Sequence, residues 1–144
     1  MTFQTINLKI SKIYTKNNNK INIFLIRKIN NKRIVNQILS VIKKNKYNIE
    51  YKLIIKIDNK KEFYQKFYPI YRKDWFEDIL KNNNNSCMVV ITNYISKDKN
   101  NQLKRYLRRY FKNNIIHSSD SPRDATRELK LLINKKNSIQ SIKL

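Results

Sequence analysis

The sequence contains no glycine, and it has only one cysteine, one histidine and two prolines in 144 residues. A single cysteine excludes an internal disulfide framework, and one cysteine with one histidine is too few to make a structural zinc site. Glycine has GC-rich codons, whereas isoleucine, asparagine and lysine, which make up about half of the chain, have AT-rich ones. The missing glycine is therefore typical of codon drift in an AT-rich genome.

Acidic residues are also scarce. The chain has 10 Asp and Glu against 32 Lys and Arg, which gives a formal charge of +22, and the first acidic residue is Glu50. A charge of this sign and size favours polyanionic partners such as RNA, DNA or anionic lipid. Codon drift is the alternative, because 24 of the cations are lysine and only 8 are arginine. The sequence leaves both explanations open.

Long apolar runs are absent as well. No run approaches the ~18 residues that a membrane-spanning helix needs, so no transmembrane segment is expected. Residues 1–20, MTFQTINLKISKIYTKNNNK, lack acids as organellar presequences do, but they also lack arginine. An organelle-encoded protein would need no presequence. We expect a mitochondrial or other organellar location, with the cytoplasm as the alternative.

Hydrophobic periodicity predicts alternating strands and helices, and apolar residues make up 40% of the chain, as in globular proteins. Strands are expected at 21–27, 47–57, 86–92 and 114–117. Helices are expected at 31–44, at 97–112 and from Pro122 onward, with one or two short helices at 60–81 that break near Pro69. Ser121, Pro122 and Asp124 form a favourable helix start, with a cap, a first-turn proline and an acid. The side chains expected to face inward from the last two helices are Leu103, Leu107, Ala125, Leu129, Leu132 and Ile133.

This order predicts an α+β fold, in which a four-stranded antiparallel sheet carries helices on one face. The length is that of one domain. We expect a basic N-terminal extension over residues 1–20, a folded domain over 21–134 and a loose basic tail over 135–144.

The stretch NNIIHSSDSPRDATREL, residues 113–129, holds the only histidine together with hydroxyl groups, two Asp and one Glu. His117 ends a predicted strand and faces the start of a helix, whose free N–H groups can bind an anion. A histidine there can accept a phosphoryl group if a partner fixes its ring. Glu128, two turns into the helix, could hold one ring nitrogen. A lone surface histidine beside a capped helix is the simpler alternative.

NIIHSSDSPRDATREL resembles the active-site signature of nucleoside diphosphate kinases, N-x-x-H-G-S-D-S followed by a helix with A-x-x-E. The resemblance extends over about residues 21–134. RIVNQILSVIKKNKYNIEYKLIIKI is similar to the first helix and second strand of that family, FYPIYRKDWFEDIL to its Y-x-x-L-x-x-x-P-F-F region, and SCMVVIT to its S-G-P-V-x-x-M strand. The resemblance implies a ferredoxin-like core. It also implies phosphoryl transfer from a nucleoside triphosphate to a nucleoside diphosphate through a phosphohistidine.

Carried over by position, the resemblance implies that His117 is the phospho-acceptor, that Glu128 orients it and that Ser119 supports the pair. The implied nucleotide-binding residues are Arg27 at the position of a motif lysine, Phe67 (or Tyr68) near a phosphate, Trp75 and Phe111 beside the base, Asn114 at the ribose, and Lys104 or Arg105 as a cation for the phosphates. The implied partners are nucleoside di- and triphosphates. Mg²⁺ would travel with the nucleotide, so no metal site of the chain itself is expected.

The sequence departs from the family pattern in three places. The K-P-D-G motif is replaced by Arg27-Lys28-Ile29-Asn30, and the glycine after the histidine is Ser118, which matters if that position needs a positive φ. The loop before the basic helix is about fifteen residues shorter than the family's. Since phosphoryl transfer depends on positioning and charge stabilisation, these losses predict weakened or lost activity.

The alternative function is a non-catalytic basic subunit of an organellar ribosome or another large assembly, binding RNA or protein with the same fold. Its support is the charge and the helix segment RYLRRYFK, in which aromatic residues lie between cations. The implied RNA-binding residues are Lys104, Arg105, Arg108, Arg109 and Lys112. A solvated amphipathic surface would explain the same pattern. The sequence does not indicate an oligomeric state.

Overall fold

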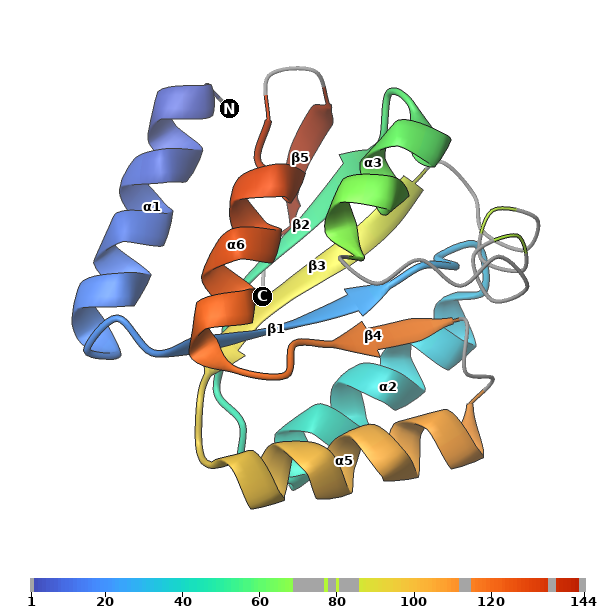
Figure 1. The fold of residues 1–144 in the computed structure, drawn as a ribbon. Coiled ribbons are helices and arrows are strands. Elements are labelled where there is room, and N and C mark those ends of the chain that lie inside the picture. The colour runs from blue at the N-terminus through green and yellow to red at the C-terminus, as the bar shows by residue number, and fades with distance from the viewer. Residues whose placement is uncertain are drawn as a thin grey trace.

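The computed structural model describes residues 2–68, 77, 80, 86–111, 115–134 and 137–142. Within them, one antiparallel sheet runs through the molecule in the order β4-β1-β3-β2-β5 (Figure 1). Its strands are β1 (Ile21–Ile26), β2 (Ile49–Lys56), β3 (Ser86–Asn93), β4 (Ile116–Ser118) and β5 (Ser138–Ile142). The first four match the predicted strands to within two residues at each end, and the α+β class is confirmed.

Helices cover both faces of this sheet, which corrects the expectation that they lie on one face (Figure 1). The helices are α1 (Phe3–Lys16), α2 (Lys32–Lys44), α3 (Lys60–Phe67), α5 (Lys97–Tyr110) and α6 (Pro122–Leu132). One buried cluster joins the sheet to α1, α3 and α6, and a second joins it to α2 and α5. The sheet is therefore the middle layer of three.

Strand β1 shows why two covered faces follow from the sequence. All six of its residues are buried, with Ile23 and Leu25 in the first cluster and Phe24 and Ile26 in the second. Successive side chains in a strand point to opposite faces, so the four consecutive apolar residues from Ile23 to Ile26 are stable only between two packed layers. The mainly apolar sequence INIFLI predicts burial on both faces, whereas an alternating pattern would predict one buried and one exposed face.

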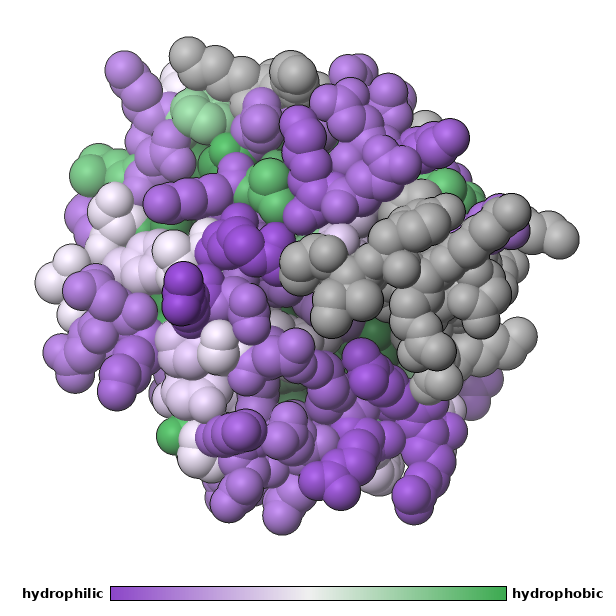
Figure 2. All heavy atoms as spheres, viewed as in Figure 1, coloured by the Kyte–Doolittle hydropathy of each residue, from purple (hydrophilic) through white to green (hydrophobic). Residues whose placement is uncertain are grey.

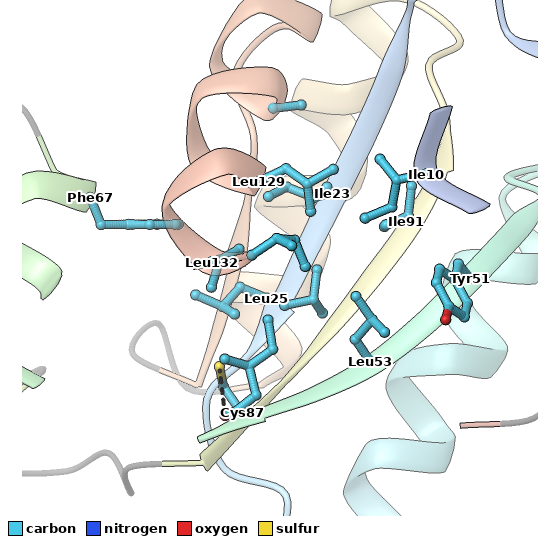
Figure 3. Packing of buried hydrophobic residues seen from close by; sticks show 14 of the residues in the cluster. Ile10, Ile23, Leu25, Tyr51, Leu53, Phe67, Cys87, Ile91, Leu129 and Leu132 are labelled. Atoms are coloured by element: carbon cyan, nitrogen blue, oxygen red, sulfur yellow. Dashed lines mark hydrogen bonds between the residues drawn. The ribbon is translucent and has the colours of Figure 1, made fainter. Parts of the chain in front are cut away.

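Helix α6 carries Glu128 and is anchored by its apolar side chains. Leu129 and Leu132 lie against Ile23 and Leu25 of β1, as Figure 3 shows. At its start Ser121 accepts a hydrogen bond from the Asp124 amide at 3.1 Å, with Pro122 in the first turn. The predicted cap is confirmed, and such caps contribute about 0.5–2 kcal/mol.

Helix α1 and strand β5 pack on the sheet, whereas residues 1–20 and 135–144 were expected to form a basic extension and a loose tail. Helix α1 buries Ile6, Ile10 and Ile13, one apolar stripe at helical spacing, in the first cluster. Strand β5 pairs with β2 from Lys56↔Ser138 to Lys52↔Ile142. An edge strand exposes unpaired N–H and C=O groups, and β5 provides partners for those of β2. The sheet thus has five strands where four were expected.

Helix α3 ends at Phe67, two residues before Pro69, as predicted. The residue before a proline is disfavoured in helical conformation, and Tyr68 already has an extended backbone with φ −104° and ψ 108°. This ending places the Phe67 and Tyr68 rings against His117. The rest of the predicted 60–81 helical region lies largely outside the described residues.

Candidate active site

His117 is the middle residue of β4, the strand at one edge of the sheet. His117 lies opposite Leu25 in the antiparallel register with β1, and beyond it the Ser119 amide donates to the Ile23 carbonyl at 3.1 Å. At the other end the Arg27 amide donates to the Ile115 carbonyl at 2.7 Å. These backbone bonds fix the strand on both sides of the histidine.

The His117 ring is held by a carboxylate. Its Nε2 lies 3.1 Å from both Oε1 and Oε2 of Glu128, and the Ser119 hydroxyl donates to Glu128 Oε1 at 2.7 Å. A carboxylate accepts but does not donate, so Nε2 carries the proton and Nδ1 keeps a lone pair. The predicted approach of Glu128 to the ring, with Ser119 beside it, is confirmed. The catalytic roles of the three residues stay predictions.

Aromatic rings enclose the imidazole. Phe67 and Tyr68 lie edge-on to it, with ring centroids 5.0 and 5.5 Å away. His117 is 8% exposed, and this burial lowers its pKa below the ordinary value of 6.5 despite the opposing effect of Glu128. The positive charges of Arg27 and Lys104 lower the pKa further. The ring is therefore neutral at neutral pH, the form in which Nδ1 can act as a nucleophile.

Cations from two parts of the chain, the end of β1 and α5, lie near this ring. Arg27 at the end of β1 is buried, with its guanidinium carbon 5.4 Å from the Tyr68 ring centre. Burial lowers the pKa of Arg27 to about 10, so it keeps its charge at neutral pH. Lys104 of α5 forms an ion pair with Asp120, which follows the histidine segment. Such a set of charges suits an anionic ligand.

Arg108 belongs to the same charged region and was not predicted as part of it. Burial alone would raise the pKa of Asp120, but Lys104, His117 and Arg108 together hold it below its ordinary value. The charge of Arg108 also acts on Arg27. Arg108 follows Lys104 by four residues and so lies on the same helical face. That spacing was visible in the sequence.

Ser118 occupies the position after His117 where the family motif has glycine. It belongs to β4, pairs with Phe24 of β1, and is not among the positive-φ residues of the described chain, which are Asn18, Asn19 and Lys46. An extended residue in a strand does not need glycine. The replacement of glycine by Ser118 is therefore compatible with this backbone.

Asn100 is a second residue that sequence reasoning missed. Its buried side chain donates to the Ser119 carbonyl at 2.6 Å and to Asn22 Oδ1 at 3.3 Å, and it accepts from the Tyr47 hydroxyl at 2.8 Å. It therefore connects α5 to β1 and to the segment that carries Ser119. A polar residue one turn before Leu103 on the apolar face of α5 was the available signal.

Arg127 connects α6 to α3. Its guanidinium donates to the carbonyls of Lys66 and Phe67 at 3.3 and 3.1 Å, and it also lies 3.6 Å from Glu128 Oε2. A cation at the end of a helix is favoured because the last carbonyls there are unpaired. Arg127 thus holds the Phe67 wall against the helix that supplies Glu128.

Other predicted site residues lie elsewhere. The Phe111 ring is 7% exposed and packs in the second core cluster, and Arg105 is exposed on the outer side of α5, where it lines a groove with Tyr106 and Arg109. Phe67 is fully buried and has no polar group for a phosphate. The predicted site residues Trp75, Lys112 and Asn114 lie outside the described residues.

Comparison with known proteins gives no match by sequence: no family model and no curated protein matches the chain. Solved structures do match. The nucleoside diphosphate kinase of Aquifex aeolicus gives a TM-score of 0.55 at 16% identity, covering 81% of this chain and 96% of the other. A nucleoside diphosphate kinase family protein from Babesia bovis gives 0.60 at 15% identity, covering 87% and 93%.

The chain has a nucleoside diphosphate kinase-like fold. This confirms the ferredoxin-like α+β architecture that the resemblance implied. At such low identity the similarity concerns the fold alone.

Two further properties concern ligands and membranes. In residues 2–68, 77, 80, 86–111, 115–134 and 137–142, no group of three or more His, Cys, Asp and Glu side chains is placed to hold a metal ion. Among the same residues, none of the helices combines the length and the apolar character needed to cross a membrane.

Proposed function

We propose that the protein transfers phosphoryl groups between nucleotides through a phosphohistidine formed at Nδ1 of His117. The observation that carries the proposal is the contact of Nε2 with both Glu128 oxygens at 3.1 Å. It leaves Nδ1 as the nitrogen with a lone pair on a neutral, immobilised ring. The nucleoside diphosphate kinase-like fold supports the same reaction by analogy.

In the first step the Nδ1 lone pair attacks the γ-phosphorus of a nucleoside triphosphate. A nitrogen–phosphorus bond forms, the bond to the β-phosphate oxygen breaks, and the nucleoside diphosphate leaves with that electron pair. The ring gains positive charge, which the Glu128 carboxylate stabilises through the Nε2 proton. In the second step a terminal oxygen of another nucleoside diphosphate attacks the phosphorus and restores the neutral imidazole.

The cations around the ring suit the phosphates. Arg27 and Lys104 bring positive charge to the histidine, and Arg108 brings it to the neighbouring Asp120, near where charge on the transferred oxygens must be stabilised. Mg²⁺ would arrive with the nucleotide and neutralise part of the phosphate charge. The carboxylates of the site are engaged by His117 and Lys104, which fits a metal ion held mainly by the substrate.

A non-catalytic role in an organellar ribosome or another large assembly is the alternative proposal. It is supported by the net charge of +22 and by the exposed cations of α5. It requires no chemistry at His117. An assay for phosphohistidine therefore separates the two proposals.

The test is incubation of the purified protein with γ-³²P-labelled ATP and Mg²⁺. The proposal expects label on the protein that is stable in base and lost in acid, as for a phosphohistidine, and that moves to CTP when unlabelled CDP is added. His117→Asn should abolish labelling while circular dichroism shows an unchanged fold. Absence of label on the folded wild-type protein would contradict the kinase proposal and favour the assembly role.

Adjacent serines provide a matched control. Ser119→Ala removes the 2.7 Å hydrogen bond to Glu128, whereas Ser118→Ala removes a buried hydroxyl for which no partner is present among the described residues. Labelling should slow in the first variant and stay near the wild-type rate in the second. Equal rates in both variants would argue against a role for Ser119 in holding the catalytic pair.

A further inference from the structure

The outer side of α5 carries a pair of exposed aromatic rings that the phosphoryl-transfer proposal does not use. Tyr106 and Tyr110 are 49% and 68% exposed, and their rings are stacked with centroids 5.7 Å apart and an interplanar angle of 9°. In the described part of the chain, the other exposed large hydrophobic side chains are Leu8 and Ile95. Two tyrosines one turn apart thus form a solvent-facing platform of two stacked rings.

Cations and grooves border this platform. A surface groove of about 330 Å³ is lined by Gln102, Arg105, Tyr106 and Arg109. A second groove of about 270 Å³ lies between α5 and α2 and is lined by Val41, Lys44, Asn45, Gln102, Leu103 and Tyr106. Tyr106 lines both grooves, so positive charge lies on each side of its ring.

The whole α2–α5 layer is basic. Its two helices contain ten Lys and Arg residues and a single acid, Asp98. Hydrophilic side chains cover most of the lower part of Figure 2, where α5 lies in Figure 1. This layer therefore attracts a polyanion and repels a second copy of itself.

We propose that this surface binds single-stranded nucleic acid. Bases would stack on Tyr106 and Tyr110, and the phosphates between them would contact Arg105, Arg109 and Lys44. Stacking on exposed aromatic rings requires unpaired bases, and it is combined with a positive groove in proteins that bind single strands without sequence preference. Association of two copies through this face would instead bring their arginines together.

The surface is separate from the His117 site although both use α5. Lys104 and Arg108 lie on the flank of the helix that faces Asp120, whereas Arg105 and Arg109 follow them by 100° and face away. Binding on the outer side is therefore testable without changing the residues around the histidine.

The experiment measures fluorescence anisotropy of a labelled 12-nucleotide oligouridine across a salt series, with an unlabelled 12-base-pair duplex as competitor. Tyr106→Ala/Tyr110→Ala should weaken binding about tenfold or more, because stacking contributes ~1–3 kcal/mol per base. Tyr106→Phe/Tyr110→Phe should bind as the wild type does. Arg105→Gln/Arg109→Gln should reduce the slope of log affinity against log salt by about 1.4, or ~0.7 per phosphate contact.

The matched control is Lys12→Gln/Lys61→Gln, which removes two exposed cations from α1 and α3 on the opposite layer. If this control changes affinity and salt slope as much as the arginine pair does, binding reflects net charge alone and the proposal is wrong. It is also wrong if the alanine variant of the tyrosines binds like the wild type or if the duplex competes best. Light scattering that shows a wild-type oligomer lost in that variant would identify the face as an interface between copies.

Discussion

The two flanks of α5 differ in how their cations are held. Lys104 forms an ion pair with Asp120 and lowers the pKa of His117, whereas Arg109, five residues later, is exposed beside a groove. Charge in a partly buried setting acts on its neighbours, while exposed charge is weakened by solvent and salt. Equal charges on one helix can therefore serve a chemical site on one side and a polyanion on the other.

The largest effect on phosphohistidine formation is expected when the carboxylate that holds the His117 ring loses its charge. Glu128→Gln keeps the size of the side chain but leaves no carboxylate to stabilise the phosphorylated ring. We expect the rate of phosphohistidine formation to fall about 10²–10³-fold, in the range for loss of one preorganised electrostatic partner. The control is Glu62→Gln, which loses only an exposed i,i+4 pair with Lys66 and should label at the wild-type rate. An equal fall in the labelling rate of both variants would show that Glu128 has no specific role in forming the phosphohistidine.

Removing one cation from each flank of α5 should change the labelling rate on the Lys104 side and leave it nearly unchanged on the Arg109 side. Lys104→Gln should slow labelling from ATP by about 10²-fold, because a phosphate would lose one positive neighbour in a partly buried site. Arg109→Gln removes the same charge from the outer flank and should change the labelling rate by less than about twofold. Single-turnover labelling measures both. A larger effect at Arg109 would place the phosphates on the outer flank instead.

Asn100, which connects α5 to β1 and to the segment of Ser119, is predicted to have a structural role. Asn100→Ala would leave the Tyr47 hydroxyl and the Ser119 carbonyl buried without their partner, and we expect it to lower the free energy of unfolding by about 2–3 kcal/mol. The neighbouring Asn101→Ala should change it by less than about 0.5 kcal/mol. Urea denaturation of both variants makes the comparison. Similar midpoints would mean that the Asn100 network contributes little.

A smaller effect is expected from Ser119→Ala. Loss of one hydrogen bond to a charged group, the 2.7 Å bond to Glu128, should slow phosphohistidine formation about tenfold. The labelling time course with saturating ATP gives this rate. A wild-type rate would indicate that Glu128 needs no second support.

The smallest effect is expected from pH above neutrality. Burial lowers the folded-state pKa of His117 below 6.5, so the ring is already neutral at pH 7 and labelling should be nearly constant between pH 7 and 8. The rate should fall as the pH drops through the folded pKa, because the protonated ring has no lone pair on Nδ1. Since the unfolded state binds the proton more readily, His117 stabilises the fold fully above pH 6.5, and this contribution is lost as the pH falls. His117→Asn should lack this part of the pH dependence of stability.

Much of the fold could be predicted from periodicity. The runs that became β1, β2 and β3, and the stripes of α2, α5 and α6, are long enough for their period to be clear. Strand β5 was missed because SIQSI has only two apolar residues and owes its order to the free edge of β2. Helix α1 was missed because its three buried isoleucines are diluted by lysines and polar residues.

The contact between His117 and Glu128 at the centre of the site could be predicted from the spacing of residues in the sequence. His117 lies in β4, Ser121 caps the helix that begins at the next residue, and Glu128 follows two turns later, so a short separation along the chain brings the carboxylate near the ring once β4 and α6 are formed. Local spacing also determined which face of α6 is apolar. These features depend on residues close together in the chain, and their outcome hardly depends on the rest of the molecule.

Only the tertiary structure decided what surrounds that contact. The aromatic rings of Phe67, the last residue of α3, and of Tyr68, which follows it, come from about fifty residues before His117 in the sequence, and Arg27 comes from the end of β1. Whether a cation of α5 faces the histidine or solvent depends on how the helix is rotated against the sheet by Leu103 and Leu107. Burial of His117, and with it the lowered pKa, follows from packing between layers, because desolvation depends on all the neighbours at once.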